Sequence, residues 1–370
     1  MPKANAQNIR IKREYFHYLK EARRRDEQSI DQVAKALSRF EDATGHKDFK
    51  RFHREQAVAF KRRLDKEKNA RTGKPLARAT VHSTLSALRE FFIWLAGQPT
   101  YKSKIAYADA DYFNLSEKDV RIAKATREKP VPTLDQVHHV LATMPAGTDT
   151  EKRNRALMAL ALLTGARGAA LMSLKLKHID LEQGCVHQDA REVRTKGSKT
   201  FTTWFCPVGG SALQIVTDWC EHLRTRLLWS EDDPLFPKTK MGLGASGGFQ
   251  ADGLAREHWR GTGAIRALYQ QAFAAAGLPY FNPHCFRDTL TQLGERICTT
   301  PEQFKAWSQN VGHERVLTTF TSYGKVPAAR QAELIRGLGQ GRGEAGGPDD
   351  AARIAALFAE FVRQRGGMAV

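Results

Sequence analysis

The sequence predicts a multidomain protein of the α and α+β classes, with an N-terminal helical bundle followed by a mainly helical domain that contains a small antiparallel sheet. Three observations support this fold class. The chain has 370 residues, more than one ordinary core needs. Its first hundred residues or so have helical spacing of apolar side chains. Strand-like alternation comes only after a proline-containing break.

Four amphipathic helices are expected in the N-terminal part. Ser29 and Gln32 are spaced as a capping box for the second helix, and Gly45 and Gly97 predict the ends of the second and fourth helices. The apolar positions are Ile11, Tyr15, Leu19 and Ala22; Ile30, Val33, Ala34, Leu37 and Phe40; Ala57, Phe60 and Leu64; and Val81, Leu85, Leu88, Phe92 and Leu95.

Prolines mark the boundary between the two parts. Pro130 and Pro132 in "REKPVPT" disfavour helix on either side, and Thr133 with Gln136 predicts the capping box of the next helix. We expect a helical domain at 1–125, a linker at 126–132, a second domain at 133–338, and a glycine-rich tether with a C-terminal amphipathic helix at 339–370.

The second domain mixes both patterns. "RNRALMALALLTGAR" predicts a buried helix, and "SALQIVTDWCEHLRTRLL" and "GTGAIRALYQQAFAAAG" predict two more. "HIDLEQGCVHQ" and "REVRTKGSKTFTTWFCPV" alternate as short antiparallel strands do. "GLGASG" has the glycine spacing of a dinucleotide-binding loop, but it lacks the required βαβ context, so we expect a surface loop there.

Charge indicates a polyanionic partner. The net charge is +18 and the isoelectric point is near 9.8. Residues 1–125 hold 28 Lys and Arg against 16 Asp and Glu, a surplus of 12, so the other residues carry +6. A highly charged, soluble surface is the simpler alternative, but this excess favours nucleic acid, bound with a steep dependence on salt.

Composition also bears on compartment. No apolar run is long enough to span a bilayer, and the N-terminus lacks a signal-peptide core, so we expect a cytoplasmic protein. The five cysteines are scattered and form no C-x-x-C pair. We expect ordinary reduced thiols rather than disulfides or a zinc site.

Six residues form the candidate catalytic set. Each has an ordinary explanation when taken singly: a surface arginine, a solvated lysine, a local polar pair on a helix, or a packed tyrosine. The set gains meaning only when it is considered as a whole. Its members are Arg167, Lys196, His284, Arg287, His313 and Tyr323.

Together these residue types fit the cleavage of a phosphodiester. Two arginines offer planar, permanently charged donors for the oxygens of a pentacoordinate phosphorus. A phenol can form a covalent phosphotyrosine, but its solution pKa near ~10 requires a proton acceptor, which histidine can supply. A lysine can protonate the expelled hydroxyl. This chemistry needs no metal or other cofactor, and the sequence shows no carboxylate cluster that would hold a divalent ion.

In chain order, "TGAR", "TKGSK", "HCFR" and "GHERVLTTFTSY" resemble the catalytic segments of the tyrosine recombinases, the phage integrase family. The basic helical bundle is similar to that family's core-binding domain. The resemblance covers roughly residues 8–340, and the ordered set is far more specific than any single motif. It implies a two-domain, C-shaped clamp around duplex DNA.

The resemblance also implies roles for the site residues. Arg167 and Arg287 would clamp the scissile phosphate. His284 would act as general acid and base, and His313 would donate a hydrogen bond to a phosphate oxygen.

The remaining roles concern the leaving group and the nucleophile. Lys196 would protonate the leaving 5′ oxygen, with Lys199 as the alternative in the same hairpin tip, and Tyr323 would become linked to the 3′ phosphate. Two features depart from the family's pattern. Ala170 stands where the family commonly has an acidic residue, and the interval from His313 to Tyr323 is one residue longer than in many members.

The activity so implied is site-specific DNA recombination or integration through a covalent 3′-phosphotyrosine, as in mobile genetic elements. The implied partners are double-stranded DNA and a homo-tetramer on two recombination sites, in which the C-terminal helix docks either on its own or on a neighbouring subunit. Accessory DNA-bending or directionality factors, and the choice among integration, excision and dimer resolution, stay open. Two alternatives use the same sequence features: a type IB topoisomerase-like relaxing enzyme and a non-catalytic DNA-binding protein.

Overall fold

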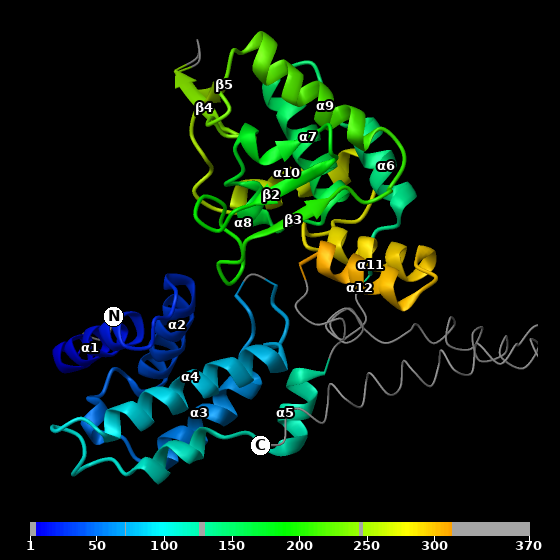
Figure 1. Cartoon of the computed structure of the whole chain (residues 1–370). Coiled ribbons are helices and arrows are strands. Elements are labelled where there is room, and N and C mark those ends of the chain that lie inside the picture. Colours follow the sequence, from blue (N-terminus) through cyan, green and yellow to red (C-terminus); the bar gives the residue numbers. More distant parts are fainter. Residues whose placement is uncertain (1–4, 71, 126–129, 244–246, 313–370) are drawn as a thin grey trace, which may run out of the picture. The chain divides into compact units, whose positions relative to one another are not determined.

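The computed structural model describes residues 5–70, 72–125, 130–243 and 247–312. The chain divides into two compact units, Met1–Thr126 and Arg127–Val370 (Figure 1). Each unit has its own buried core. His313, Tyr323 and the C-terminal helix expected around 351–362 lie outside the described residues.

The described residues of the first unit are mainly helical, as expected, with an isolated antiparallel bridge between Lys68 and Pro75. These residues include all four predicted helices, a fifth short helix and two 3₁₀ turns. The elements are α1 (Ala6–Glu21), α2 (Glu27–Thr44), η1 (Phe49–Arg51), α3 (Arg54–Lys66), α4 (Arg78–Ala96), η2 (Tyr107–Phe113) and α5 (Glu117–Lys124).

The C-terminal end of α2 agrees with the prediction from the sequence, and the N-terminal end does not. Gly45 terminates the helix in the left-handed conformation, with φ of +66°, as predicted. The N-terminal prediction was wrong: the cap is Asp26, whose carboxylate accepts a 2.7 Å hydrogen bond from the Ser29 backbone N–H. With Asp26 as the cap, the helix begins at Glu27. A capping box at Ser29 would have started it about one turn later.

Aromatic rings fill the centre of the first unit. Phe92, on α4, packs against Phe52 at 4.1 Å between ring centroids and against Phe113 at 5.2 Å. Phe40, on α2, meets Phe113 edge-on at 5.6 Å. Because η2 delivers Phe113 into this cluster, the segment after α4 belongs to the core, although its own sequence has no helical periodicity.

The described residues of the second unit are also mainly helical and form two small antiparallel sheets (Figure 1). Its elements are α6 (Leu134–Thr143), α7 (Asp149–Thr164), α8 (Gly168–Leu171), η3 (Leu176–His178), β1 (Ile179–Asp180), β2 (Cys185–Gln188), β3 (Phe201–Trp204), α9 (Ala212–Glu221), the π-helical turn η4 (His222–Arg226), β4 (Lys238–Leu243), β5 (Phe249–Ala255), α10 (Gly263–Ala275), α11 (Cys285–Ile297) and α12 (Pro301–Asn310).

Helix α7 is the centre of this unit. Every residue from Ala156 to Thr164 is buried, which explains why the sequence is apolar all round rather than along one stripe. The predicted capping box of α6 is present, since Thr133 and Gln136 bond to each other's backbone N–H groups.

Strands β1, β2 and β3 form a three-stranded sheet in that order. Cys185 pairs with Trp204 and Gln188 with Phe201, so the chain between β2 and β3 forms a long hairpin loop. The expected strand character of "REVR" was wrong. The N–H groups of Glu192 and Val193 both bond to the Asp189 carbonyl, so the loop opens with a turn.

The first two residues of "GLGASG" lie in a strand, where a loop was expected. Gly242 belongs to β4, which pairs with β5 from Lys238 opposite Ala255 to Leu243 opposite Phe249. The base of this hairpin is anchored by buried Arg153 of α7, which donates to the Pro237 carbonyl at 2.8 Å. This pairing joins residues on both sides of the glycines, and a reading of the glycine motif alone does not predict it.

Helix α12 packs on α11 through one close contact. The Trp307 indole N–H donates to the Leu290 carbonyl at 3.0 Å and lies over Gly294. A β-carbon at Gly294 would stand 2.4 Å from Trp307 Nε1, so only glycine fits there without movement of the indole. No helix in the described part of the chain is long and apolar enough to cross a membrane.

We predict that Gly294→Ala lowers the free energy of unfolding by up to about 2 kcal/mol. The methyl group displaces Trp307, which costs about 1–3 kcal/mol, and the ~1 kcal/mol that alanine gains over glycine in a helix offsets part of that cost. Urea denaturation followed by tryptophan fluorescence measures it. The matched control is Gly263→Ala, the first residue of α10, which has open space around it and should leave stability unchanged or slightly higher. Equal midpoints for both variants would contradict the contact.

Candidate functional site

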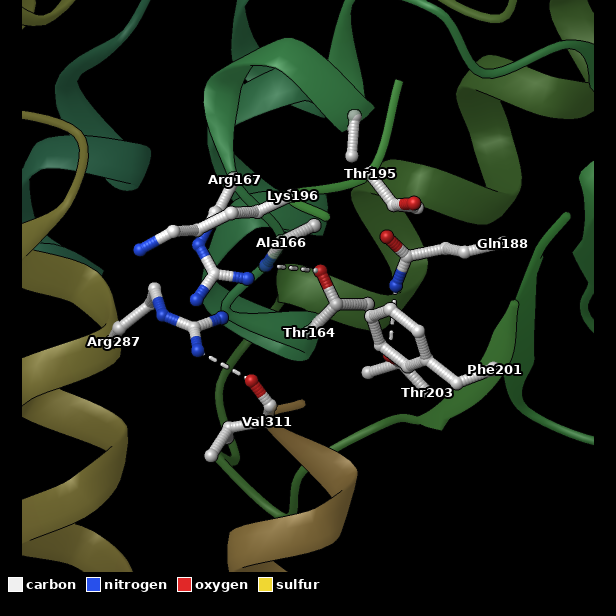
Figure 2. A pocket seen from close by; sticks show the side chains of 11 residues that line it. Thr164, Ala166, Arg167, Gln188, Thr195, Lys196, Phe201, Thr203, Arg287 and Val311 are labelled. Carbon is white, nitrogen blue, oxygen red and sulfur yellow. Dashed lines mark hydrogen bonds between the residues drawn. The ribbon is translucent and has the colours of Figure 1, made fainter. Parts of the chain in front are cut away.

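A pocket in the second unit brings together three of the six predicted catalytic residues. Arg167, Lys196 and Arg287 line it, although they are far apart in sequence. The other lining residues are Thr164, Ala166, Ala170, Gln188, Thr195, Phe201, Thr203 and Val311. Figure 2 shows the two guanidinium groups beside each other, with the Lys196 side chain alongside. None of these described lining residues is acidic, so the pocket suits an anion.

The end of α7 places Arg167. Gly165 caps the helix with φ of +58°, and a β-carbon there would approach Leu290 Cδ1 to 3.0 Å. The Thr164 hydroxyl donates to the Leu160 carbonyl at 2.6 Å and accepts from the Ala166 N–H at 3.1 Å, which fixes the exit direction of the chain (Figure 2). This tight turn sets Arg167 at the start of α8, half-buried at the pocket wall.

Arg287 extends from the first turn of α11 and has only 3% of its surface exposed. Its Nη1 donates to the Gly165 carbonyl at 2.6 Å, and its Nη2 donates to the Val311 carbonyl (Figure 2). A buried charge is costly unless its donors are satisfied. These two backbone carbonyls therefore both stabilise the guanidinium and set the orientation of its plane.

Lys196 lies in the long loop between β2 and β3 and is exposed. Gly197 and Ser198 have φ of +72° and +51°, which reverses the chain directly after the lysine. The Thr195 hydroxyl donates to the Lys199 carbonyl at 2.7 Å and closes this turn. The prediction of a lysine on a hairpin tip is thus confirmed, and only Lys196 of the two candidate lysines lines the pocket.

Ion pairs hold the base of the same loop. Glu192 lies 2.8 Å from Nε2 of buried His178 and accepts a 2.9 Å hydrogen bond from Lys177. Because His178 Nδ1 accepts from the Lys175 N–H, the Nε2 atom carries the proton. The bond from Lys177, followed by that from His178, lowers the pKa of Glu192 to about 2. The loop therefore extends from a fixed base.

His284 lies outside the pocket lining. It is the N-cap residue of α11, three positions before Arg287, and its side chain is exposed. Its backbone N–H donates to Asn282 Oδ1 at 2.9 Å. The described residues thus unite Arg167, Arg287 and Lys196, place His284 one helical turn away, and do not include His313 or Tyr323.

Other pocket residues were missed from the sequence. Gln188 and Thr203, joined by a 2.8 Å hydrogen bond, come from facing strands, and Val311 contributes a backbone carbonyl. The alternation of inward-facing side chains along β2 and β3 could have indicated Gln188 and Thr203 from the sequence. Ala170 also lines the pocket, so this position adds no carboxylate beside the arginines.

One group among the described residues has the composition of a metal site. Asp180, Cys185 and His187 lie on neighbouring strands with ligand atoms within 4.8 Å of one another. Strand pairing brings them together, whereas their spacing in the sequence does not suggest it. None of the three lines the pocket. All five cysteines are free thiols in this structure.

The chain is similar to known proteins. Residues 131–327 match the model of the phage integrase family, and residues 13–98 match its N-terminal SAM-like domain. The tyrosine recombinase XerC of Lactobacillus delbrueckii subsp. bulgaricus is 27% identical over 254 residues, covering 67% of this chain and 72% of that protein. XerC of Escherichia coli O157:H7 is 34% identical over 164 residues, covering 44% and 48%.

The fold has solved counterparts. A lambda integrase fragment, residues 75–356 of that protein, solved as a dimer bound to a COC′ core site, aligns with a TM-score of 0.58 and 14% identity, covering 86% of this chain and 96% of that one. This likeness concerns the fold. The match to the family model spans more than half of the chain and includes all six predicted catalytic positions. The chain therefore belongs to the phage integrase family of tyrosine recombinases.

Proposed function

We propose that the protein is a site-specific DNA recombinase that cleaves and rejoins DNA through a 3′-phosphotyrosine at Tyr323 and exchanges strands between specific sites. The observation that carries the proposal is the convergence of Arg167, Arg287 and Lys196 on one pocket without an acidic lining residue. Family membership supports the same activity.

The arginine pair suits the charge of the transition state. As the phenol attacks, phosphorus becomes pentacoordinate, and negative charge accumulates on its two non-bridging oxygens. Arg287 is oriented before any substrate arrives, by the Gly165 and Val311 carbonyls, so less reorganisation accompanies the reaction. Arg167 adds a second guanidinium from a different helix end.

The proposed step conserves atoms and charge. The Tyr323 oxygen bonds to phosphorus and its proton passes to His284, while the bond from phosphorus to the 5′ oxygen breaks and Lys196 protonates that oxygen. His313 donates a hydrogen bond to a phosphate oxygen. The reverse sequence rejoins the strand, and the energy of the phosphodiester is retained in the phosphotyrosine, so no ATP is consumed.

Partners follow from the chemistry. Exchange between two duplexes breaks four strands, and each break occupies one tyrosine, so we propose a homo-tetramer on two double-stranded sites. The N-terminal unit, with its 28 Lys and Arg in residues 1–125, is proposed as the core-binding domain and Arg127 onward as the catalytic part. We place the reaction in the cytoplasm, at the nucleoid.

A topoisomerase-like relaxing enzyme is the less favoured alternative. It would use the same phosphotyrosine without partner exchange, but the related proteins reported above are named recombinases and integrases. A non-catalytic DNA-binding protein would account for the positive charge and not for the convergence of two arginines and a lysine on one pocket.

We expect Tyr323→Phe to abolish the covalent protein–DNA adduct while DNA binding is retained, because the variant loses only the nucleophilic oxygen. Nicked duplexes covering the DNA that flanks the encoding gene serve as substrates, and denaturing gels reveal the adduct. Tyr280→Phe, a change at an exposed tyrosine of the same unit, is the matched control and should behave as wild type. Adduct formation by Tyr323→Phe at the wild-type level would rule out this nucleophile.

Replacement of Arg287 by lysine should slow cleavage by roughly 10²–10³-fold, the usual effect of losing one transition-state donor. A lysine keeps the charge but cannot reach both carbonyls and the phosphate with one ammonium group. Single-turnover rates on nicked DNA measure the effect. Arg266→Lys, at an exposed position on α10, is the control. Comparable rates for the two variants would refute the role of Arg287.

The identity of the proton donor can be tested with a modified substrate. A 5′-bridging phosphorothiolate expels a thiolate, whose conjugate acid has a pKa near ~8.5, so its departure requires no proton donor at neutral pH. Lys196→Ala should therefore be strongly impaired on ordinary DNA and close to wild type on the phosphorothiolate. If Lys199→Ala shows this pattern and Lys196→Ala does not, the other lysine of the loop is the acid.

A further inference from the structure

A side chain of α12 occupies the outer edge of strand β3. The Trp204 N–H donates to Asn310 Oδ1 at 2.7 Å, and Asn310 Nδ2 donates to the Trp204 carbonyl at 2.9 Å. A carboxamide carries one acceptor and a donor in the same arrangement as a peptide group. It therefore makes the pair of bonds that a neighbouring antiparallel strand would make. Asn310 Nδ2 also lies 3.6 Å from Cys206 Sγ.

The same short segment of β3 and its exit is bound to α7. The Cys206 N–H donates to the Leu163 carbonyl at 2.7 Å, next to the last residue of that helix. Residues 204–206 thus connect the C-terminal end of α7 with the C-terminal end of α12.

These two helix ends supply both carbonyls that orient Arg287. Gly165 follows Leu163 by two residues, and Val311 follows Asn310 directly. Adjacent Cα atoms are about 3.8 Å apart across a peptide bond, so the position of Asn310 closely limits that of the Val311 carbonyl. Gly312 then packs under the Phe201 ring, where a β-carbon would stand 3.1 Å from the ring.

We propose that Asn310 is a positioning residue for Arg287: by pairing with the Trp204 backbone, it holds the Val311 carbonyl at the spacing from Gly165 that the guanidinium bridges. This inference rests on the proposed function, in which Arg287 binds the scissile phosphate. Asn310 itself is not among the pocket-lining residues, and its effect on the reaction passes through the Val311 backbone.

The competing explanation is that Asn310 only fills space between α12 and the sheet. The two explanations differ for Asn310→Asp, which keeps the shape and the acceptor but replaces the donor with an oxygen facing the Trp204 carbonyl. Positioning through the paired bonds predicts a defect at least as large as that of Asn310→Ala. Space-filling predicts activity near wild type.

The experiment measures single-turnover cleavage of nicked DNA by the full chain, alongside DNA affinity and thermal unfolding. We expect Asn310→Ala and Asn310→Asp to cut the cleavage rate by roughly 10- to 100-fold, the scale of a small misplacement of a reacting group. DNA affinity should stay unchanged, which shows that the variants fold. Gln309→Ala, at the exposed neighbouring position, should match wild type.

The phosphorothiolate substrate identifies the group on which Asn310 acts. It should restore cleavage in Lys196→Ala but not in Asn310→Ala, because the defect of the latter is in the phosphate clamp. Restoration in Asn310→Ala, or a wild-type rate for Asn310→Asp, overturns the inference. If the wild-type chain itself forms no adduct, the proposed function fails, and crystal structures decide the positioning separately: an Arg287–Val311 bond that persists in Asn310→Ala overturns it.

Discussion

Arg287 places a permanent positive charge inside the second unit, with 3% of its surface exposed. A charge at that depth is tolerated only where its donors find acceptors, and here two backbone carbonyls serve, one after α7 and one after α12. Both acceptors are neutral backbone groups, so they orient the guanidinium without cancelling its charge.

Because Arg287 needs two correctly spaced carbonyls, the helices that carry them pack closely at two glycines. Gly165 has the left-handed conformation that favours glycine, and a β-carbon there would stand 3.0 Å from Leu290 Cδ1. Gly294 must leave room for Trp307, which seats α12 on α11. Each glycine serves close approach of helices whose ends present the acceptors, and a shift of either helix would change the orientation of Arg287.

A second source of positive charge at the pocket is the loop between β2 and β3. Lys196 is exposed on the turn between β2 and β3, while the base of that loop is held by Glu192 through Lys177 and His178. The two cations thus differ in exposure, which suits the roles proposed for them: proton delivery by the exposed ammonium and charge stabilisation by the buried guanidinium.

The sequence alone determined the four N-terminal helices and α7, because their apolar positions and terminal glycines are local properties, and it indicated the chemistry, because the residue types in their order fit one reaction. It misplaced the start of α2, where Asp26 rather than Ser29 is the cap, and it treated Gly242 and Leu243 of β4 as part of a loop. Only the tertiary structure revealed the contacts of Asn310 with Trp204 and of Arg287 with Gly165, which join residues 106 and 122 positions apart. A backbone carbonyl or a paired carboxamide leaves no periodic or compositional trace, so its role depends on which distant segments the fold brings together.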